Sequence, residues 1–229
     1  MARAASRFYK VVTVAPALGG YGVFLDGRAL KTPGKLAFIT RSEAHARLAA
    51  AEWEAQGEEI NPQTMPITRL YNVAIERTPQ QREAMVAEFK KYGGTDLLCY
   101  RAVEPHALRA REAAAWDPWL TWARSLGIDL QTADSVIAIA QAPQSLAALA
   151  DQARAVDDFE LTLLLHFMAV FGSAVLALAV LKGALPAPQA YELSRVDAQF
   201  QTERWGEDDE AKTITAQTRR EVEILSQLL

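Results

Sequence analysis

The chain has 229 residues, a formal net charge of −4, 50% hydrophobic residues and 23% charged residues. This balance excludes a disordered or collagen-like chain, and the length allows one large or two small domains, each with its own core. The small acidic excess argues against a nucleic-acid-binding protein, which usually carries a basic excess.

The first forty residues predict an antiparallel meander. Asp26 and Gly27 stand between two apolar runs, and this dipeptide is typical of the two-residue type I′ turn of a hairpin. The expected strands cover residues 8–14, 21–25, 28–31 and 36–39. The N-terminal segment before them is basic but has no apolar stretch behind it, so it is not typical of a secretory signal. We therefore expect a bacterial cytoplasmic protein or an already processed one.

Helical patterns follow the meander. Ser42 is a suitable N-cap for a helix that runs to Gln56. Further helices are expected over residues 67–76, 80–92, 108–126 with an interruption at Asp117–Pro118, 144–156, 158–182, 188–205 and 207–229. Residues 95–101 fit either a strand or a helix start, and residues 127–140 look extended. The chain is thus predicted to be α+β, with a β-containing domain over residues 1–94 and an all-helical domain over residues 95–229.

Residues 161–181 form a nearly continuous apolar run, and about 20 apolar residues can span a bilayer. A helix that is apolar on all sides can equally be the central helix of a helical domain. We expect the buried helix and no stable membrane insertion, with His166 as a hydrogen-bonded core residue. A membrane span is the alternative.

Catalytic signatures are absent from the sequence. It has no phosphate-binding loop, no dinucleotide fingerprint, no HExxH and no GxSxG, and its three histidines stand in separate segments. Cys99, the single cysteine, has apolar neighbours and allows neither an intrachain disulfide nor a cysteine zinc site. We therefore expect no cofactor, no metal and no enzymatic activity.

Several segments combine charged and aromatic residues. Trp53 is interpreted as a core residue or a plug between domains. Trp119 and Trp122 share a helix face, where aromatic packing is a commoner role than ligand stacking or an interface. Arg69 and Asn72 are three residues apart on a helix. They either tie adjacent loops or hold a carboxylate or phosphate.

An alternative function uses these polar residues. A small-molecule enzyme would need Arg69 and Asn72 to converge with Cys99 and Asp117 in one cleft. On the hairpin, Arg28 and Lys31 are expected on the solvent side, where a partner can reach them.

The helix expected over residues 188–205 has a charged face. Arg195 and Gln199 are four residues apart on one side, and Asp197 and Glu203 are expected to point outward. Such a face is usually only solvated, but it also suits recognition of a basic partner.

Seven segments together resemble the assembly chaperones that handle the alpha subunit of the F-type ATPase catalytic head. They are RFYK (7–10), LDGRALKTP (25–33), EWEAQ (52–56), MPITRLYNVAI (65–75), TDLLCYR (95–101), WDPWLTWA (116–123) and LSRVDAQFQTERWG (193–206). Their order along the chain makes the resemblance specific, and the N-terminus resembles that of a bacterial member.

The resemblance implies a non-enzymatic protein, monomeric when free, that binds the free alpha subunit and shields surfaces that later contact the beta subunit. It implies a cytoplasmic location in bacteria and a mitochondrial one for eukaryotic relatives. It also implies an important acidic residue on the helix that ends in Trp-Gly, which maps to Asp197, with Glu203 as the next candidate. Arg195 and Gln199 accompany them as expected client contacts, and Trp53 is a second important position, through folding.

Overall fold

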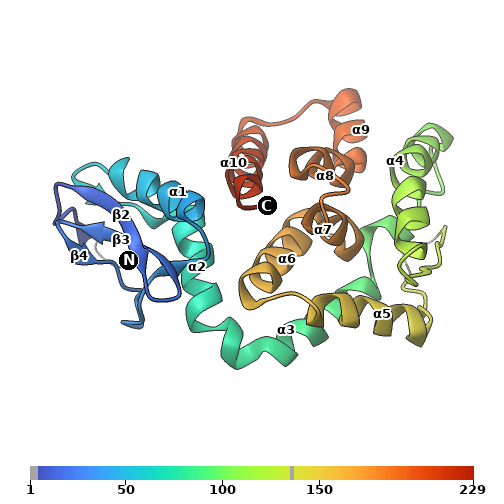
Figure 1. Ribbon diagram of the computed structural model, residues 1–229. Helices are drawn as coiled ribbons and strands as arrows, with labels where there is room; N and C mark the ends of the chain where they lie inside the picture. The colour runs from blue at the N-terminus through green and yellow to red at the C-terminus, as the bar shows by residue number, and fades with distance from the viewer. Residues whose placement is uncertain (1–4, 135–136) are drawn as a thin grey trace. The chain divides into compact units, whose positions relative to one another are not determined.

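The computed structural model describes residues 5–134 and 137–229, and the chain packs into two compact units that divide between Gln81 and Arg82. This division lies inside helix α3 (Thr78–Gly93). The predicted domain boundary, between residues 94 and 95, lies at the end of the same helix and stays a prediction. Figure 1 shows the strands gathered in the first unit and helices making up the second. The predicted α+β class is confirmed.

The N-terminal unit is built on an antiparallel sheet. Its strands are β2 (Val12–Ala17), β3 (Gly20–Leu25), β4 (Arg28–Ala29) and β5 (Ile39–Thr40), with β2 and β4 on either side of β3 and β5 also paired to β3. Asp26 and Gly27 have φ values of 48° and 77°, as a type I′ turn requires. The Asp26 carboxylate accepts hydrogen bonds from the backbone N–H groups of Lys10 and Val11, which holds the hairpin against the preceding chain.

Two details of the meander differ from the sequence prediction. The strand expected over residues 8–14 begins only at Val12 and extends to Ala17. A separate two-stranded pairing, β1 (Ala5–Ser6) with β6 (Glu59–Ile60), was not predicted, because two-residue strands carry no periodic pattern. It brings the start of the chain to the segment between the helices.

Helices α1 (Glu43–Glu54) and α2 (Pro66–Glu76) complete this unit, with the 3₁₀ turn η1 (Pro62–Thr64) between them. Ser42 caps α1 as predicted, because its side chain accepts a hydrogen bond from the His45 N–H. The N-terminus of α2 is capped by another helix. The Glu52 carboxylate of α1 accepts hydrogen bonds from the N–H groups of Ile67 (2.7 Å) and Thr68 (2.8 Å).

The C-terminal unit is helical in its described part. After α3 its elements are η2 (Leu97–Cys99), α4 (His106–Arg124), α5 (Pro143–Arg154), α6 (Asp158–Phe171), α7 (Ala174–Leu181), α8 (Ala187–Ser194), α9 (Val196–Trp205), α10 (Asp209–Leu225) and η3 (Ser226–Leu228). The segment predicted as extended contains a bridge from Ala133 to Tyr100. Residues 1–4 and 135–136, which were included in the predictions, lie outside the described residues.

The long apolar run is buried as predicted, but it is not one helix. Gly172 takes a left-handed conformation, with φ of 65°, and ends α6. The Ser173 side chain then accepts a hydrogen bond from the Leu176 N–H and starts α7. Within the described chain, no helix is both long and apolar enough to cross a membrane.

Two further helix predictions were wrong. The helix expected over residues 188–205 is two helices, because Arg195 leaves helical geometry with φ of −108° and ψ of 11°. Conversely, α4 continues through Pro118, where an interruption was predicted. Buried Trp116 and Leu120 pack on both sides of this proline, and tertiary packing of this kind outweighs the one backbone hydrogen bond that a proline removes.

Candidate functional site

A buried tryptophan joins α4 to the chain that leads into α9. The Trp116 indole N–H donates a hydrogen bond to the Leu193 carbonyl at 2.8 Å, and the side chain is fully buried. The Arg101 guanidinium lies 5.0 Å from the Trp116 ring and forms an ion pair with Asp117 at 2.7 Å. The WDPWLTWA and TDLLCYR segments therefore hold the start of α9 against α4.

Two carboxyl groups meet where α9 packs on α4. Glu112 is 1% exposed, and its carboxylate accepts a hydrogen bond from the Ala102 N–H at 2.8 Å. Burial, together with a hydrogen bond and the like charge from Asp197, raises the pKa of Glu112 to about 7. The expectation that Asp197 points outward was wrong. Its Oδ1 atom is buried, and its carboxyl group lies close enough to Glu112 to favour the protonated form of Glu112.

The other residues predicted on this face point in different directions. Arg195 donates a hydrogen bond to the Thr215 hydroxyl of α10 at 3.2 Å, so it lies toward that helix. Gln199 is exposed and donates to Glu192 of α8 at 2.8 Å. Glu203 is exposed and forms an ion pair with Arg111 of α4 at 2.7 Å. The four residues predicted as one face therefore share a helix but not one surface.

Trp205 is a candidate that the sequence analysis did not select. It ends α9 directly before Gly206, and 75% of its surface is exposed. Phe200 is the buried aromatic residue of this helix, and five helical residues separate the two side chains by about 140° around the axis. Helical spacing could therefore have placed Trp205 away from the core. Large exposed tryptophans are typical of protein–protein contacts.

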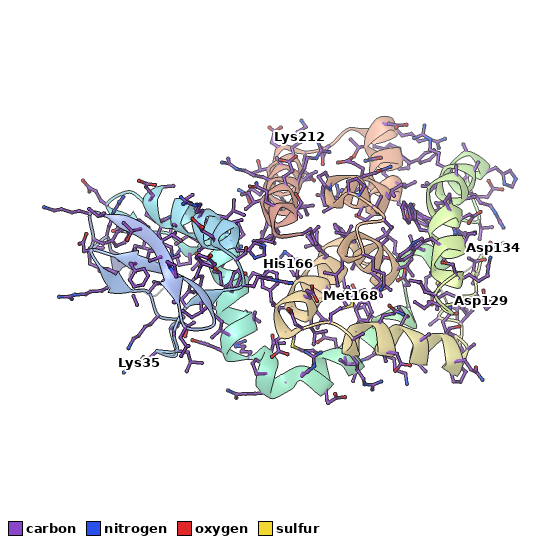
Figure 2. The ribbon with its side chains drawn as sticks, viewed as in Figure 1. Lys35, Asp129, Asp134, His166, Met168 and Lys212 are labelled. Carbon is purple, nitrogen blue, oxygen red and sulfur yellow. The ribbon has the colours of Figure 1, made fainter. Side chains whose placement is uncertain are left out.

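The structure also shows what packs against the tryptophan pair Trp119 and Trp122 and against His166. Trp119 and Trp122 are half-buried and pack edge to face, with ring centroids 6.3 Å apart. His166 is half-buried on α6, where Figure 2 labels it. Its ring packs edge to face on Phe167, and Nε2 lies 3.8 Å from the Glu221 carboxylate.

The N-terminal unit contains a cavity of about 920 Å³. Its lining residues are Phe8, Tyr9, Leu25, Asp26, Arg28, Ala29, Leu30, Lys31, Pro33, Trp53, Ile60, Pro62, Met65, Thr68, Arg69 and Asn72. All of them except Ile60 and Pro62 come from LDGRALKTP, MPITRLYNVAI, RFYK and EWEAQ, four of the segments that stood out in the sequence. Arg69 and Asn72 are brought together in this wall, as their spacing on α2 predicted.

Trp53 forms part of the cavity wall. Its ring packs edge to face on Tyr9, with centroids 5.6 Å apart, and the Tyr9 hydroxyl donates a hydrogen bond to the Trp53 carbonyl at 2.6 Å. Below it, Glu52 caps α2, and the buried Gln56 side chain accepts a hydrogen bond from the Asn61 N–H. The EWEAQ segment therefore supports the cavity from one side.

The remaining residues of the alternative enzyme site are poorly suited to catalysis. Cys99 is buried in the C-terminal unit, and burial raises the pKa of its thiol to about 12, so it is protonated at neutral pH. Asp117 is paired with Arg101. Among the described residues that line the cavity, Asp26 carries the one carboxylate, and backbone N–H groups already hold it. The described cavity wall therefore offers no acid–base pair.

The cavity of the N-terminal unit and the exposed Trp205 of the helical unit are both surfaces on which another molecule can bind, as expected of a binding protein. The family described as ATP12 chaperone protein matches residues 6–124, and this chain belongs to that family. Members of this family are assembly chaperones of the F1 part of the ATP synthase, as the resemblance of the seven segments predicted.

Relatives from three organisms support this assignment. The crystal structure of Atp12 from Paracoccus denitrificans is 41% identical, with a TM-score of 0.89, and the match covers 98% of this chain and 96% of that one. An aspartate-to-lysine variant of that protein matches equally well. The structure of Atu1473 from Agrobacterium tumefaciens is 36% identical, also with a TM-score of 0.89, over 98% of this chain and 86% of that one. Protein atp12, mitochondrial, from Schizosaccharomyces pombe is 25% identical over 91% of this chain and 76% of its own length.

Proposed function

We propose that this protein binds the free alpha subunit of the F-type ATPase and shields the surfaces that later contact the beta subunit. An unassembled subunit exposes a large apolar interface, and covering it prevents aggregation. In this proposal the protein acts in the bacterial cytoplasm, as a monomer, without enzymatic activity and without cofactor, metal or nucleic acid. Its membership in a family of assembly chaperones supports the proposal.

The observation that carries the proposal is the exposed end of α9. Trp205 is 75% exposed, and Glu203, two residues earlier on the same helix, is exposed on the side that faces Arg111 of α4. We infer that Glu203 and Gln199 contact the client directly. Asp197, which lies against Glu112 of α4, and Arg195, which donates a hydrogen bond to Thr215, set the direction of α9 and complete the client-binding group. Trp53, Trp119 and Trp122 act as structural residues.

Co-expression of the chain with either the alpha or the beta subunit, followed by affinity capture, tests this function. We expect capture of alpha and not of beta. Asp197→Lys should retain the fold, because a lysine there can pair with Glu112, while it changes the direction of α9 and weakens capture of alpha. Glu88→Lys is the matched control, since Glu88 is exposed on α3, away from α9. Capture of beta alone, or of neither subunit, would refute the proposal.

A further inference from the structure

The cavity of the N-terminal unit is not used by the function proposed for α9. We propose that it is a second client site, which binds an extended peptide segment that carries apolar side chains next to carboxylates. The identity of this segment as part of the client depends on the proposed function, whereas the binding chemistry follows from the cavity itself.

The cavity is larger than the volume that a single side chain would fill. Its volume of about 920 Å³ lies near the upper end of the ~300–1,000 Å³ typical of ligand pockets. Leu25, Ile60 and Met65 give it a buried apolar floor. At its edge Phe8 is 70% exposed, a large apolar surface that a bound ligand would cover.

The charge of the lining selects an anionic ligand. Arg28, Lys31 and Arg69 line the cavity, and Arg28 and Lys31 are exposed without an ion pair to any described residue. The single carboxylate among the described lining residues belongs to Asp26, which is engaged by the N–H groups of Lys10 and Val11. The wall therefore carries an excess of positive charge, and carboxylates complement it.

Two unsatisfied polar atoms favour a peptide over other apolar anions. The indole Nε1 of Trp53 and the amide Oδ1 of Asn72 are both buried, and neither has a hydrogen-bond partner in the described part of the chain. One is a donor and the other an acceptor, and a buried polar group left unpaired costs about 1–3 kcal/mol. Both atoms are closed off from the open cavity, so a ligand reaches them only when the two side chains rotate, and each peptide unit then offers an N–H and a C=O that can satisfy both. A fatty acid offers neither along its chain.

The probes are short fluorescein-labelled peptides, measured by anisotropy with the full-length protein. The first alternates leucine with aspartate, the second leucine with lysine, and the third serine with aspartate. We expect only the leucine–aspartate peptide to bind. The double variant Arg28→Glu with Lys31→Glu should weaken binding by at least about tenfold, since two attractive contacts become repulsive.

Two further variants test whether the position of the positive charge matters and whether the N–H donor of Trp53 takes part in binding. Lys35→Glu is the matched control, because Lys35, labelled in Figure 2, is an exposed cation of the same loop that does not line the cavity. Its binding should stay within about twofold of the unaltered protein, because an exposed charge outside the site contributes little. Trp53→Phe keeps the ring and removes the N–H donor, so binding should weaken by about three- to tenfold while the melting temperature stays near that of the unaltered protein.

Several results would overturn the inference. These are equal binding of the serine–aspartate or leucine–lysine peptide, full binding by the Arg28→Glu and Lys31→Glu double variant, or displacement of the peptide by dodecanoate that binds more tightly. Capture of the alpha subunit distinguishes this failure from failure of the proposed function. If the alpha subunit is captured but no peptide binds, the peptide site in the cavity is refuted and the proposed function is not. If the leucine–aspartate peptide binds as expected but the alpha subunit is not captured, the alpha subunit is refuted as the client and the peptide site is not.

Discussion

Around α9 in the C-terminal unit, charged side chains contact one another. Arg111 pairs with Glu203, Arg101 pairs with Asp117, and the carboxyl group of Asp197 lies close to that of Glu112. Around the cavity of the N-terminal unit, Arg28 and Lys31 face solvent without an ion pair to described residues, and Trp53 Nε1 lies buried without a partner there.

This difference separates the groups that maintain the fold from those left for a ligand. In the C-terminal unit, changing a buried polar group leaves its partner uncompensated, so stability is affected together with binding. In the N-terminal unit, changing Arg28 or Lys31 breaks no ion pair with a described residue, so binding should respond far more than stability.

Trp116→Ala should lower the free energy of unfolding by about 3–5 kcal/mol, because it empties a fully buried site and leaves the Leu193 carbonyl without its donor. Urea unfolding followed by circular dichroism measures this loss. Trp205→Ala is the matched control, since that tryptophan is exposed, and it should change stability by less than about 0.5 kcal/mol. Equal effects of the two variants would contradict the assignment of Trp116 as the joint between α4 and α9.

Trp53→Arg should lower stability by about 1–3 kcal/mol, because it removes the edge-to-face contact with Tyr9 and places a charge in a half-buried wall. The effect should be smaller than that of Trp116→Ala, since an arginine can extend into the open cavity. Thermal unfolding measures it. Normal thermal stability together with lost capture of the alpha subunit would show that Trp53 is an interface residue instead.

The Glu112–Asp197 pair should make stability depend on pH. The pKa of Glu112 is raised from 4.5 to about 7, so the folded protein holds a proton that the unfolded chain releases in this range. The free energy of unfolding should therefore fall, by about 1–3 kcal/mol, as pH rises from about 4.5 to about 7. Glu112→Gln should flatten this slope, because glutamine cannot titrate, and Glu203→Gln should leave it unchanged. Urea unfolding at a series of pH values measures the slope, and an unchanged slope in Glu112→Gln would refute the raised pKa of Glu112.

Glu203→Lys should change stability by no more than about 1 kcal/mol, because its ion pair with Arg111 is half exposed. Capture of the alpha subunit should nevertheless weaken, since an exposed charge of the proposed client-binding group is reversed. The two measurements are thermal unfolding and affinity capture of the same preparation. Full capture would remove Glu203 from the client-binding group.

Local features with a short-range cause were predictable from the sequence. The hairpin turn at Asp26–Gly27 and the N-cap at Ser42 follow from backbone preferences of single residues, and both were found. The neighbourhood of Arg69 and Asn72 follows from helical spacing alone. The family resemblance came from ordered segments rather than from any site, and it was confirmed.

Other features depend on partners distant in sequence. Glu52 caps α2 from a different helix, and the break in the apolar run needs Gly172 in a left-handed conformation that only packing selects. Spacing alone suggested that Asp197 faces solvent, but α4 covers it and places Glu112 beside it. The cavity likewise needs the hairpin and α2 to meet.

Periodicity and residue chemistry act over a few neighbours, so the fold class, the local turns and caps, and membership in the chaperone family follow from the order of the amino acids. Which charged groups are paired and which remain available depends on how distant segments pack together. The burial and pairing of a polar side chain depend on which residues pack against it. For Asp197 and Trp53, these neighbours cannot be inferred from the spacing of residues along the chain.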